Sequence, residues 1–308
     1  MHRHPVGALV LRYHRVADLP RDPFGIAVSP ARFAEHLELI RRDFVPMALA
    51  DLVAASAQGS PPRRAVAITF DDGYLDLAVT ARPLLERFEL PATAYLITDA
   101  LDVDTEPWWD TLARVVLAPE AIGTRLTLAI GNRVVAVDLA PGDDPVGEAA
   151  RIASLRLLVD RLRRLCPEAR ERAIGSIPAG TGSIARKPDD RLLRGREVID
   201  LDRSSAIEIG AHTESHPMLA SLDPAGRAAE IGGSKRRLEA LLGHPIASFA
   251  YPYGTGTRYA KTVREAGFRS ACTTRARRLG RRTDPLRVPR VYVGDWDGDE
   301  LARRLAAL

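Results

Sequence analysis

Short apolar runs alternate along the chain with segments of helical periodicity, and this alternation restricts the fold more than any other feature. The apolar runs cover residues 6–13, 65–70, 91–97, 207–211, 248–251 and 270–273. Several are rich in β-branched residues and stop abruptly, as buried parallel strands do. Apolar residues recur at helical spacing in 30–42, 47–55, 77–88, 225–242 and 259–265. The order of strand, helix and strand predicts an α/β protein with a largely parallel sheet.

The alternation is interrupted between residues 102 and 202. In this segment the dipeptide 131–132, Gly-Asn, separates two short apolar runs, which is typical of a two-residue β-hairpin. A long helix is expected over 147–165, with its arginines mostly away from the apolar stripe. We therefore predict a core formed by 1–101 and 203–308, with 102–202 as an insertion whose hairpin and helices pack on that core.

Composition and charge exclude several classes of protein. Hydrophobic residues make up 46% and charged residues 27% of the 308 residues, as in ordinary globular proteins. The net charge of +4 comes mostly from scattered arginines without interleaved aromatic residues, so no nucleic-acid partner is expected. Cys166 and Cys272 are too few and too far apart for a disulfide framework or a thiolate zinc site.

The N-terminal segment carries only a short apolar run, residues 6–11. This run is shorter than the apolar core of a signal peptide and much shorter than a membrane-spanning helix. We expect no integral membrane segment and a cytoplasmic location.

Acidic residues and histidines follow two of the predicted strands. Asp71 and Asp72 come directly after one strand, while His212 follows another and His216 lies four positions further on. Active sites of α/β folds form where such strands end. Two imidazoles at this spacing can face one point from a helical turn, or from a turn leading into one. An Asp-Asp-Gly turn or a lone histidine is often only structural, but the two groups together predict a metal site.

The motifs around these residues resemble those of the polysaccharide deacetylases with a NodB homology domain, also called carbohydrate esterase family 4. Thr69-Phe70-Asp71-Asp72-Gly73 matches the first motif of that family, and His212-Thr213-Glu214-Ser215-His216 matches the second. Tyr251-Pro252-Tyr253-Gly254 resembles the loop of the third. The resemblance spans roughly 5–100 and 203–295, and it implies a distorted (β/α)7-type barrel.

The resemblance also implies the chemistry. By position, Asp72, His212 and His216 match the ligands of a divalent metal, commonly Zn²⁺, although Co²⁺, Ni²⁺ and Mn²⁺ suit the same ligands. Asp71 matches the base that activates the attacking water, and the backbone amide of Tyr253 matches a donor to the oxyanion. The implied substrate is an N-acetylated sugar, an oligosaccharide or a lipid-linked glycan, from which acetate is released.

Two parts of the family pattern are missing. The third motif usually begins with an arginine that orients the catalytic aspartate, but Ala250 occupies that position, so the group is absent or is another arginine. The late Leu-x-His motif, whose histidine protonates the leaving amine, has no counterpart in 287–293. His14 follows Tyr13 in a sequence that resembles an opening motif of one branch of the family. It is either the replacement acid or a buried histidine that closes the first strand.

Aromatic and proline residues supply candidate contacts to a sugar. Tyr251 and Pro252 belong to the third-motif loop, and the indoles of Trp108 and Trp296 can stack on sugar rings. Core packing would explain both tryptophans as well. Two other functions stay open: a glycan-binding pseudoenzyme, suggested by the missing groups, and an amidase that acts on a non-sugar amide.

Overall fold

The core of the protein is one curled parallel sheet. The computed structural model describes residues 7–59, 61–118, 124–141, 144–177, 186 and 188–308, so the predicted start of the first strand at residue 6 lies outside it. The strands are β1 (Leu9–Tyr13), β4 (Val45–Pro46), β5 (Ala65–Phe70), β6 (Ala92–Leu96), β9 (Ile207–Ala211), β10 (Ser248–Ala250), β11 (Ser270–Cys272) and β12 (Val291–Tyr292).

The strand order explains the curled shape. It runs β11-β10-β9-β6-β5-β1-β12, with β4 paired to the start of β5, and every pairing is parallel. A further parallel bridge joins Cys272, at one edge strand, to Val288, which leads into β12 at the other edge. The sheet therefore curls toward closure and forms the distorted (β/α) barrel that the sequence predicts.

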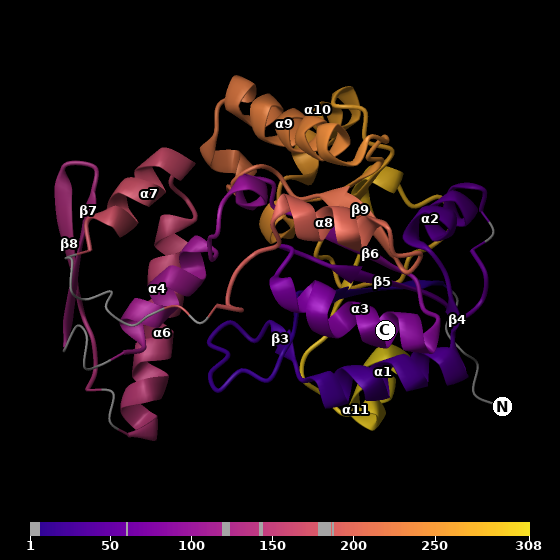
Figure 1. Ribbon diagram of the computed structural model, residues 1–308, viewed down its shortest axis with the longest axis horizontal. Coiled ribbons are helices and arrows are strands. Elements are labelled where there is room, and N and C mark those ends of the chain that lie inside the picture. Colours follow the sequence, from indigo (N-terminus) through magenta and orange to yellow (C-terminus); the bar gives the residue numbers. More distant parts are fainter. Residues whose placement is uncertain (1–6, 60, 119–123, 142–143, 178–185, 187) are drawn as a thin grey trace.

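Helices surround this sheet (Figure 1). They are α1 (Pro30–Asp43), α2 (Leu49–Ala57), α3 (Arg82–Phe88), α4 (Trp108–Val116), α6 (Pro145–Leu162), α7 (Pro167–Gly175), α8 (Gly195–Asp202), α9 (Pro224–Leu242), α10 (Ala260–Glu265) and α11 (Gly298–Ala306). None of the helices in the described ranges is both long and apolar enough to cross a bilayer.

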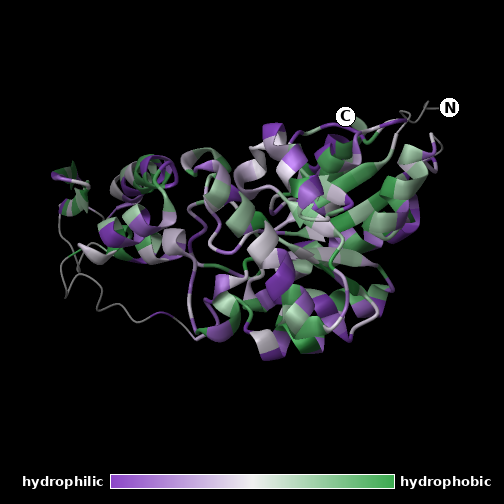
Figure 2. Cartoon of the chain, turned by 90° about the horizontal axis from the view of Figure 1, so that it is seen from above, coloured by the Kyte–Doolittle hydropathy of each residue, from purple (hydrophilic) through white to green (hydrophobic). Residues whose placement is uncertain are grey.

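The sheet is apolar because both of its faces are covered. Every residue of β5 and of β6 is buried. In Figure 2 the strands are mostly green, whereas the helices around them carry both hydrophobic and hydrophilic residues. Such continuous apolar runs are expected for parallel strands that lie between layers of helices.

The helix predicted over 77–88 is not uniform. It begins as a π-helical turn over Leu77–Ala81 and continues as α3. Pro83 lies in the first turn of α3 and has no amide hydrogen to donate to the preceding turn. The wider π-helical turn before it accommodates this missing hydrogen bond.

The segment 102–202 contributes a lobe beside the core, on the left of Figure 1. The predicted hairpin is present as the antiparallel strands β7 (Arg125–Ile130) and β8 (Arg133–Asp138). These strands share a hydrophobic cluster with α4, α6 and α7. In contrast, α8 contacts β9 and α9 in the core. The assignment of the whole segment as an insertion stays a prediction.

One arginine of α6 differs from the expectation that the arginines of this helix point away from its apolar face. Arg151 is 1% exposed and donates hydrogen bonds to the carbonyl groups of Val116 and Ala140. Val116 is the last residue of α4, where carbonyl groups have no partner within the helix. The several N–H donors of the buried guanidinium bind these carbonyl groups, so Arg151 links α6 to the end of α4.

Candidate metal centre

The chain turns sharply where β5 ends, and this turn presents two carboxylates. Asp72 and Gly73 both have left-handed backbone conformations, with φ of +71° and +81°. A Cβ atom at Gly73 would be strained by this backbone conformation and would lie 2.7 Å from the Leu96 side chain, so glycine is favoured there. The amide of Asp71 donates to the carbonyl of Tyr13, which continues the sheet to its carboxyl edge. Asp71 and Asp72 are thereby held side by side at this edge.

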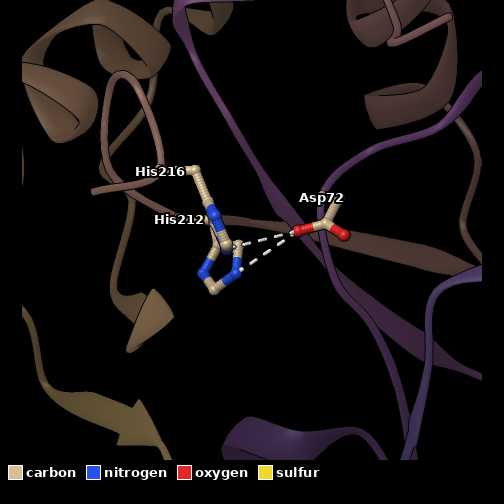
Figure 3. A group of neighbouring side chains, drawn as sticks. All are labelled: Asp72, His212 and His216. Atoms are coloured by element: carbon tan, nitrogen blue, oxygen red, sulfur yellow. Dashed lines mark ion pairs between the residues drawn. The ribbon is translucent and has the colours of Figure 1, made fainter. Parts of the chain in front are cut away.

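Asp72 and the two predicted histidine ligands face one another (Figure 3). The Asp72 Oδ1 atom lies 3.6 Å from Nε2 of His212 and 3.6 Å from Nε2 of His216. All three side chains are buried, and their ligand atoms lie within 4.8 Å of one another. Ligand atoms about 2.1 Å from a tetrahedral zinc ion are about 3.4 Å apart. The three residues therefore have the spacing that a divalent metal requires.

The protonation of these groups also suits a metal. The His212 Nδ1 atom lies 2.8 Å from the Ala250 carbonyl oxygen, which places the proton on Nδ1 and leaves Nε2 as a lone-pair donor. Burial lowers the pKa of His212 and, with the adjacent His212, that of His216, so both rings are neutral. Burial and the charge of Asp71 raise the pKa of Asp72 well above its usual value. A cation would relieve the cost of ionising Asp72.

Of the two arrangements expected from the sequence, a helical turn and a turn leading into one, the helical turn is not observed. Residues 212–216 form a loop, in which Thr213 and His216 have φ of +70° and +56°. The amide of His216 donates to Thr213 Oγ1 over 3.1 Å, which stabilises the turn. The spacing of four residues thus brings the two rings together through a loop that contains two left-handed residues.

Arg290 orients Asp71 and supplies the group that is missing at Ala250. Its Nη1 and Nη2 atoms donate to the two carboxylate oxygens of Asp71 over 2.6 and 2.7 Å, and Nη1 also donates to Thr69 Oγ1. Its Nε atom donates to the Thr273 carbonyl. Burial raises the pKa of Asp71, but the surrounding groups, Arg290 foremost, together hold it well below its usual range. Asp71 is therefore ionised and fixed in orientation.

No motif in the sequence singles out Arg290. It lies in the segment 287–293, where the family pattern has a histidine, and the chain contains many other arginines. The one local signal is its position immediately before the short apolar strand β12, which places it at the edge of the sheet.

His14 lies between β1 and β2 (Arg15–Val16), on the same edge. Burial and the charge of Arg12 lower its pKa to about 3, although Asp71 acts in the opposite direction. His14 is therefore a neutral imidazole close enough to Asp71 for the carboxylate charge to act on its pKa. Its position agrees with a role at the site, but this low pKa does not favour His14 as a proton donor, so the role as the acid stays a prediction.

Aromatic rings enclose His216. The rings of Tyr253 and Trp109 have centroids 4.5 and 4.9 Å from the imidazole. Trp109 Nε1 donates to the hydroxyl of Tyr74, which donates to Asp110, so the indole is fixed in orientation. The backbone of Tyr253 is left-handed, with φ of +58°. These contacts leave His216 little freedom to rotate.

A cavity of about 340 Å³ borders this wall, within the size range of small-molecule sites. His216, Trp108, Trp109, Arg170 and Glu171 are among its lining residues. One wall thus comes from the histidine loop of the core and the other from the segment 102–202.

Of the four residues predicted to contact a sugar, only Trp108 lines this cavity. Tyr251 is fully buried and donates its hydroxyl to the Leu286 carbonyl, and Pro252 is buried as well. Trp296 packs against Tyr292 and under Arg304, next to α11. Contacts between a sugar and Tyr251, Pro252 or Trp296 stay predictions, and the packing of these residues does not favour them.

Two solved protein structures superimpose on almost the whole of this chain. The deacetylase PplD of Streptococcus pyogenes, solved with acetate, superimposes with a TM-score of 0.63 and 15% identity over 98% of this chain and 99% of its own. IcaB from Ammonifex degensii superimposes with a TM-score of 0.61 and 20% identity, over 97% of each chain. These similarities confirm the barrel-like fold.

Sequence comparisons identify the family. The poly-beta-1,6-N-acetyl-D-glucosamine N-deacetylase of Escherichia coli (strain K12) is 31% identical over 88 residues, which are 28% of this chain but only 13% of that protein. The profile of the polysaccharide deacetylases matches residues 58–125 and 186–271, together half of the chain. The chain therefore belongs to the polysaccharide deacetylase family.

Proposed function

We propose that this protein is a metal-dependent hydrolase that removes the acetyl group from an N-acetylated sugar or glycan and releases acetate. The observation that carries the proposal is the buried triad of Asp72, His212 and His216 with the Asp71–Arg290 pair beside it. A binding protein without catalysis would need neither a metal triad nor a fixed carboxylate. The Asp71–Arg290 pair also removes one reason for the pseudoenzyme alternative, since an orienting arginine is present.

The proposed metal ligands are Asp72, His212 and His216. A divalent cation, Zn²⁺ first among the candidates, would polarise the acetamide carbonyl and lower the pKa of the attacking water. The two imidazoles and the carboxylate are buried, and their ligand atoms face one another, so the three groups are already arranged to bind a cation.

Asp71 is the proposed proton acceptor. Arg290 binds both of its carboxylate oxygens, but each oxygen retains a further lone pair that can accept a proton from water. The arginine keeps the carboxylate ionised and aimed in one direction, so the base does not rotate away from the triad. The backbone amide of Tyr253 would donate to the oxyanion, since this residue packs against His216.

The proposed substrate is an N-acetylated sugar, oligosaccharide or lipid-linked glycan. The cavity beside His216 provides space for it, with Trp108 on its wall. The curated relative named above acts on poly-beta-1,6-N-acetyl-D-glucosamine, which makes N-acetylglucosamine oligomers the first substrates to test.

The test is metal analysis of the purified protein followed by acetate release from these oligomers. We expect about one divalent ion per chain, loss of acetate release after chelation, and recovery when Zn²⁺ is restored. Bound metal without acetate release from any glycan would favour the amidase or the binding protein. Absence of bound metal, with no uptake of added ions, would overturn the assignment of the triad.

His14→Ala is expected to lower turnover by about 10²-fold, because the proposed donor of a proton to the leaving amine is removed. Metal content is expected to stay at the wild-type level, since His14 is not one of the proposed ligands. The matched control is His244→Ala, which removes an exposed histidine paired with Asp202. Turnover of His14→Ala equal to that of the control would exclude His14 as the acid.

A further inference from the structure

The loop that carries both histidines, residues 212–216, has an unfavourable backbone. Thr213 and His216 are non-glycine residues with left-handed φ. Such conformations persist only where the surrounding structure imposes them. The loop must therefore be held by contacts outside itself.

Glu230 of α9 holds the loop from its amide side. Its carboxylate accepts hydrogen bonds from the amides of Glu214 and Ser215 over 2.9 and 3.0 Å, and from the Ser215 hydroxyl over 2.5 Å. Glu230 thus accepts from the amides of Glu214 and Ser215. Of the loop carbonyls, those of Thr213 and Glu214 accept from the amides of Thr98 and Asp99, which leaves those of Ser215 and His216 to other donors.

Arg170 of α7 holds the same loop from its carbonyl side. Its Nη2 atom donates to the Ser215 carbonyl over 3.0 Å, and its Nη1 atom approaches the His216 carbonyl at 3.5 Å. The guanidinium also stacks over the ring of Trp108, 5.0 Å from its centroid. Arg170 thus contacts the loop directly at one of the proposed metal ligands.

Arg170 is buried in a position where its charge is costly. The residue is 2% exposed, and no ion pair joins it to an acid in the part of the chain that the structure describes. Burying a guanidinium without a carboxylate partner is costly, and an apolar residue of similar size would avoid that cost. A buried guanidinium at this position is explained if the loop 212–216 needs its N–H donors.

We propose that Arg170 is a positioning residue of the metal centre, which fixes the His216 imidazole by binding the carbonyl groups of Ser215 and His216. Because α7 belongs to the segment 102–202, this segment forms part of the metal-binding apparatus and is more than a substrate wall. The inference rests on the proposed function only in requiring that the triad binds a metal.

The test compares metal affinity in three variants of the full chain. Arg170→Met keeps an unbranched, flexible side chain at this buried position but removes every donor and the guanidinium that stacks on Trp108. Arg170→Lys keeps one charge and can reach only one carbonyl. Arg172→Met, on the exposed face of the same helix, is the matched control.

The measurements are the Kd of Zn²⁺ for the chelator-stripped proteins by calorimetry, the visible absorption of the Co²⁺ forms, and the melting midpoint of each apoprotein. We expect Arg170→Met to weaken Zn²⁺ binding by about 10–100-fold, with a changed Co²⁺ spectrum. Arg170→Lys should fall between Arg170→Met and wild type, and Arg172→Met should match wild type.

Two outcomes would overturn the proposal. Wild-type Kd and Co²⁺ spectrum in Arg170→Met would do so, even with a lowered melting midpoint, because a purely structural role lowers stability without changing the affinity of the folded site. If Arg170→Met does not fold, wild-type Kd in Arg170→Lys has the same meaning. Failure of the wild-type protein itself to bind Zn²⁺ would instead refute the proposed metal centre, and the positioning role with it.

Discussion

Replacing Arg290 by methionine is expected to lower the free energy of unfolding by about 3–5 kcal/mol. Arg290 is fully buried, and its bidentate partner Asp71 is 3% exposed. Without the arginine, Asp71 would remain as a buried carboxylate with no cation bound to it, and its hydrogen bonds would be lost. The same change should abolish most of the turnover, because the base would lose its orientation and would bind a proton more readily.

Urea unfolding of the variant checks the first effect. Arg287→Met is the matched control, because Arg287 is exposed and pairs only loosely with Asp284 at 3.5 Å; this variant should differ from wild type by less than about 0.5 kcal/mol. The double variant Asp71→Asn with Arg290→Met should be less destabilised than the sum of the single changes, since neither charge is then left unpaired. Equal stability of Arg290→Met and Arg287→Met would show that the ion pair is not formed.

Asp71→Asn is expected to lower turnover by about 10³–10⁴-fold while the protein keeps its metal. Asparagine has nearly the same shape as aspartate but cannot accept a proton at this site. The proposed ligands Asp72, His212 and His216 are unchanged. The measurements are acetate release at saturating substrate and the metal content of the same preparation.

The control for Asp71→Asn must separate lost catalysis from lost stability, because the change also leaves Arg290 without a counter-charge. Asp76→Asn serves this purpose, since Asp76 is likewise buried and paired with an arginine, Arg15, at 2.8 Å. This control should lose stability and keep its turnover at a temperature where it is folded. Turnover of Asp71→Asn within tenfold of that control would exclude Asp71 as the base.

Local sequence patterns predicted most of the core. The apolar runs 65–70 and 207–211 coincide with β5 and β9, and the hairpin around 131–132 is present. These features depend on residues close together in the chain, such as β-branched runs and turn-forming dipeptides, so their signal is readable without the fold. The departures, including the π-helical turn at 77–81 and the buried Arg151, depend on neighbours that the local pattern does not contain.

The residues of the site also fall into those that local sequence patterns predict and those that only the structure identifies. Asp72, His212 and His216 were found from the sequence because each follows a strand, and parallel strands end at one edge of the sheet. Arg290 and Asp71 are 219 residues apart, and Arg170 and His216 are 46 residues apart. Such a pairing requires only a long flexible side chain at the right point in space, for which no spacing along the chain is characteristic.

The sequence by itself therefore determined the class of fold, the family motifs and the four residues at the strand ends that the proposed chemistry uses. Only the tertiary structure decided which arginine orients Asp71, how two left-handed residues aim the histidines, and that Glu230 and Arg170 hold their loop. The physical reason is that strand ends are set by local backbone geometry, whereas buried hydrogen bonds between distant side chains exist only once the barrel has curled and the segment 102–202 lies beside it.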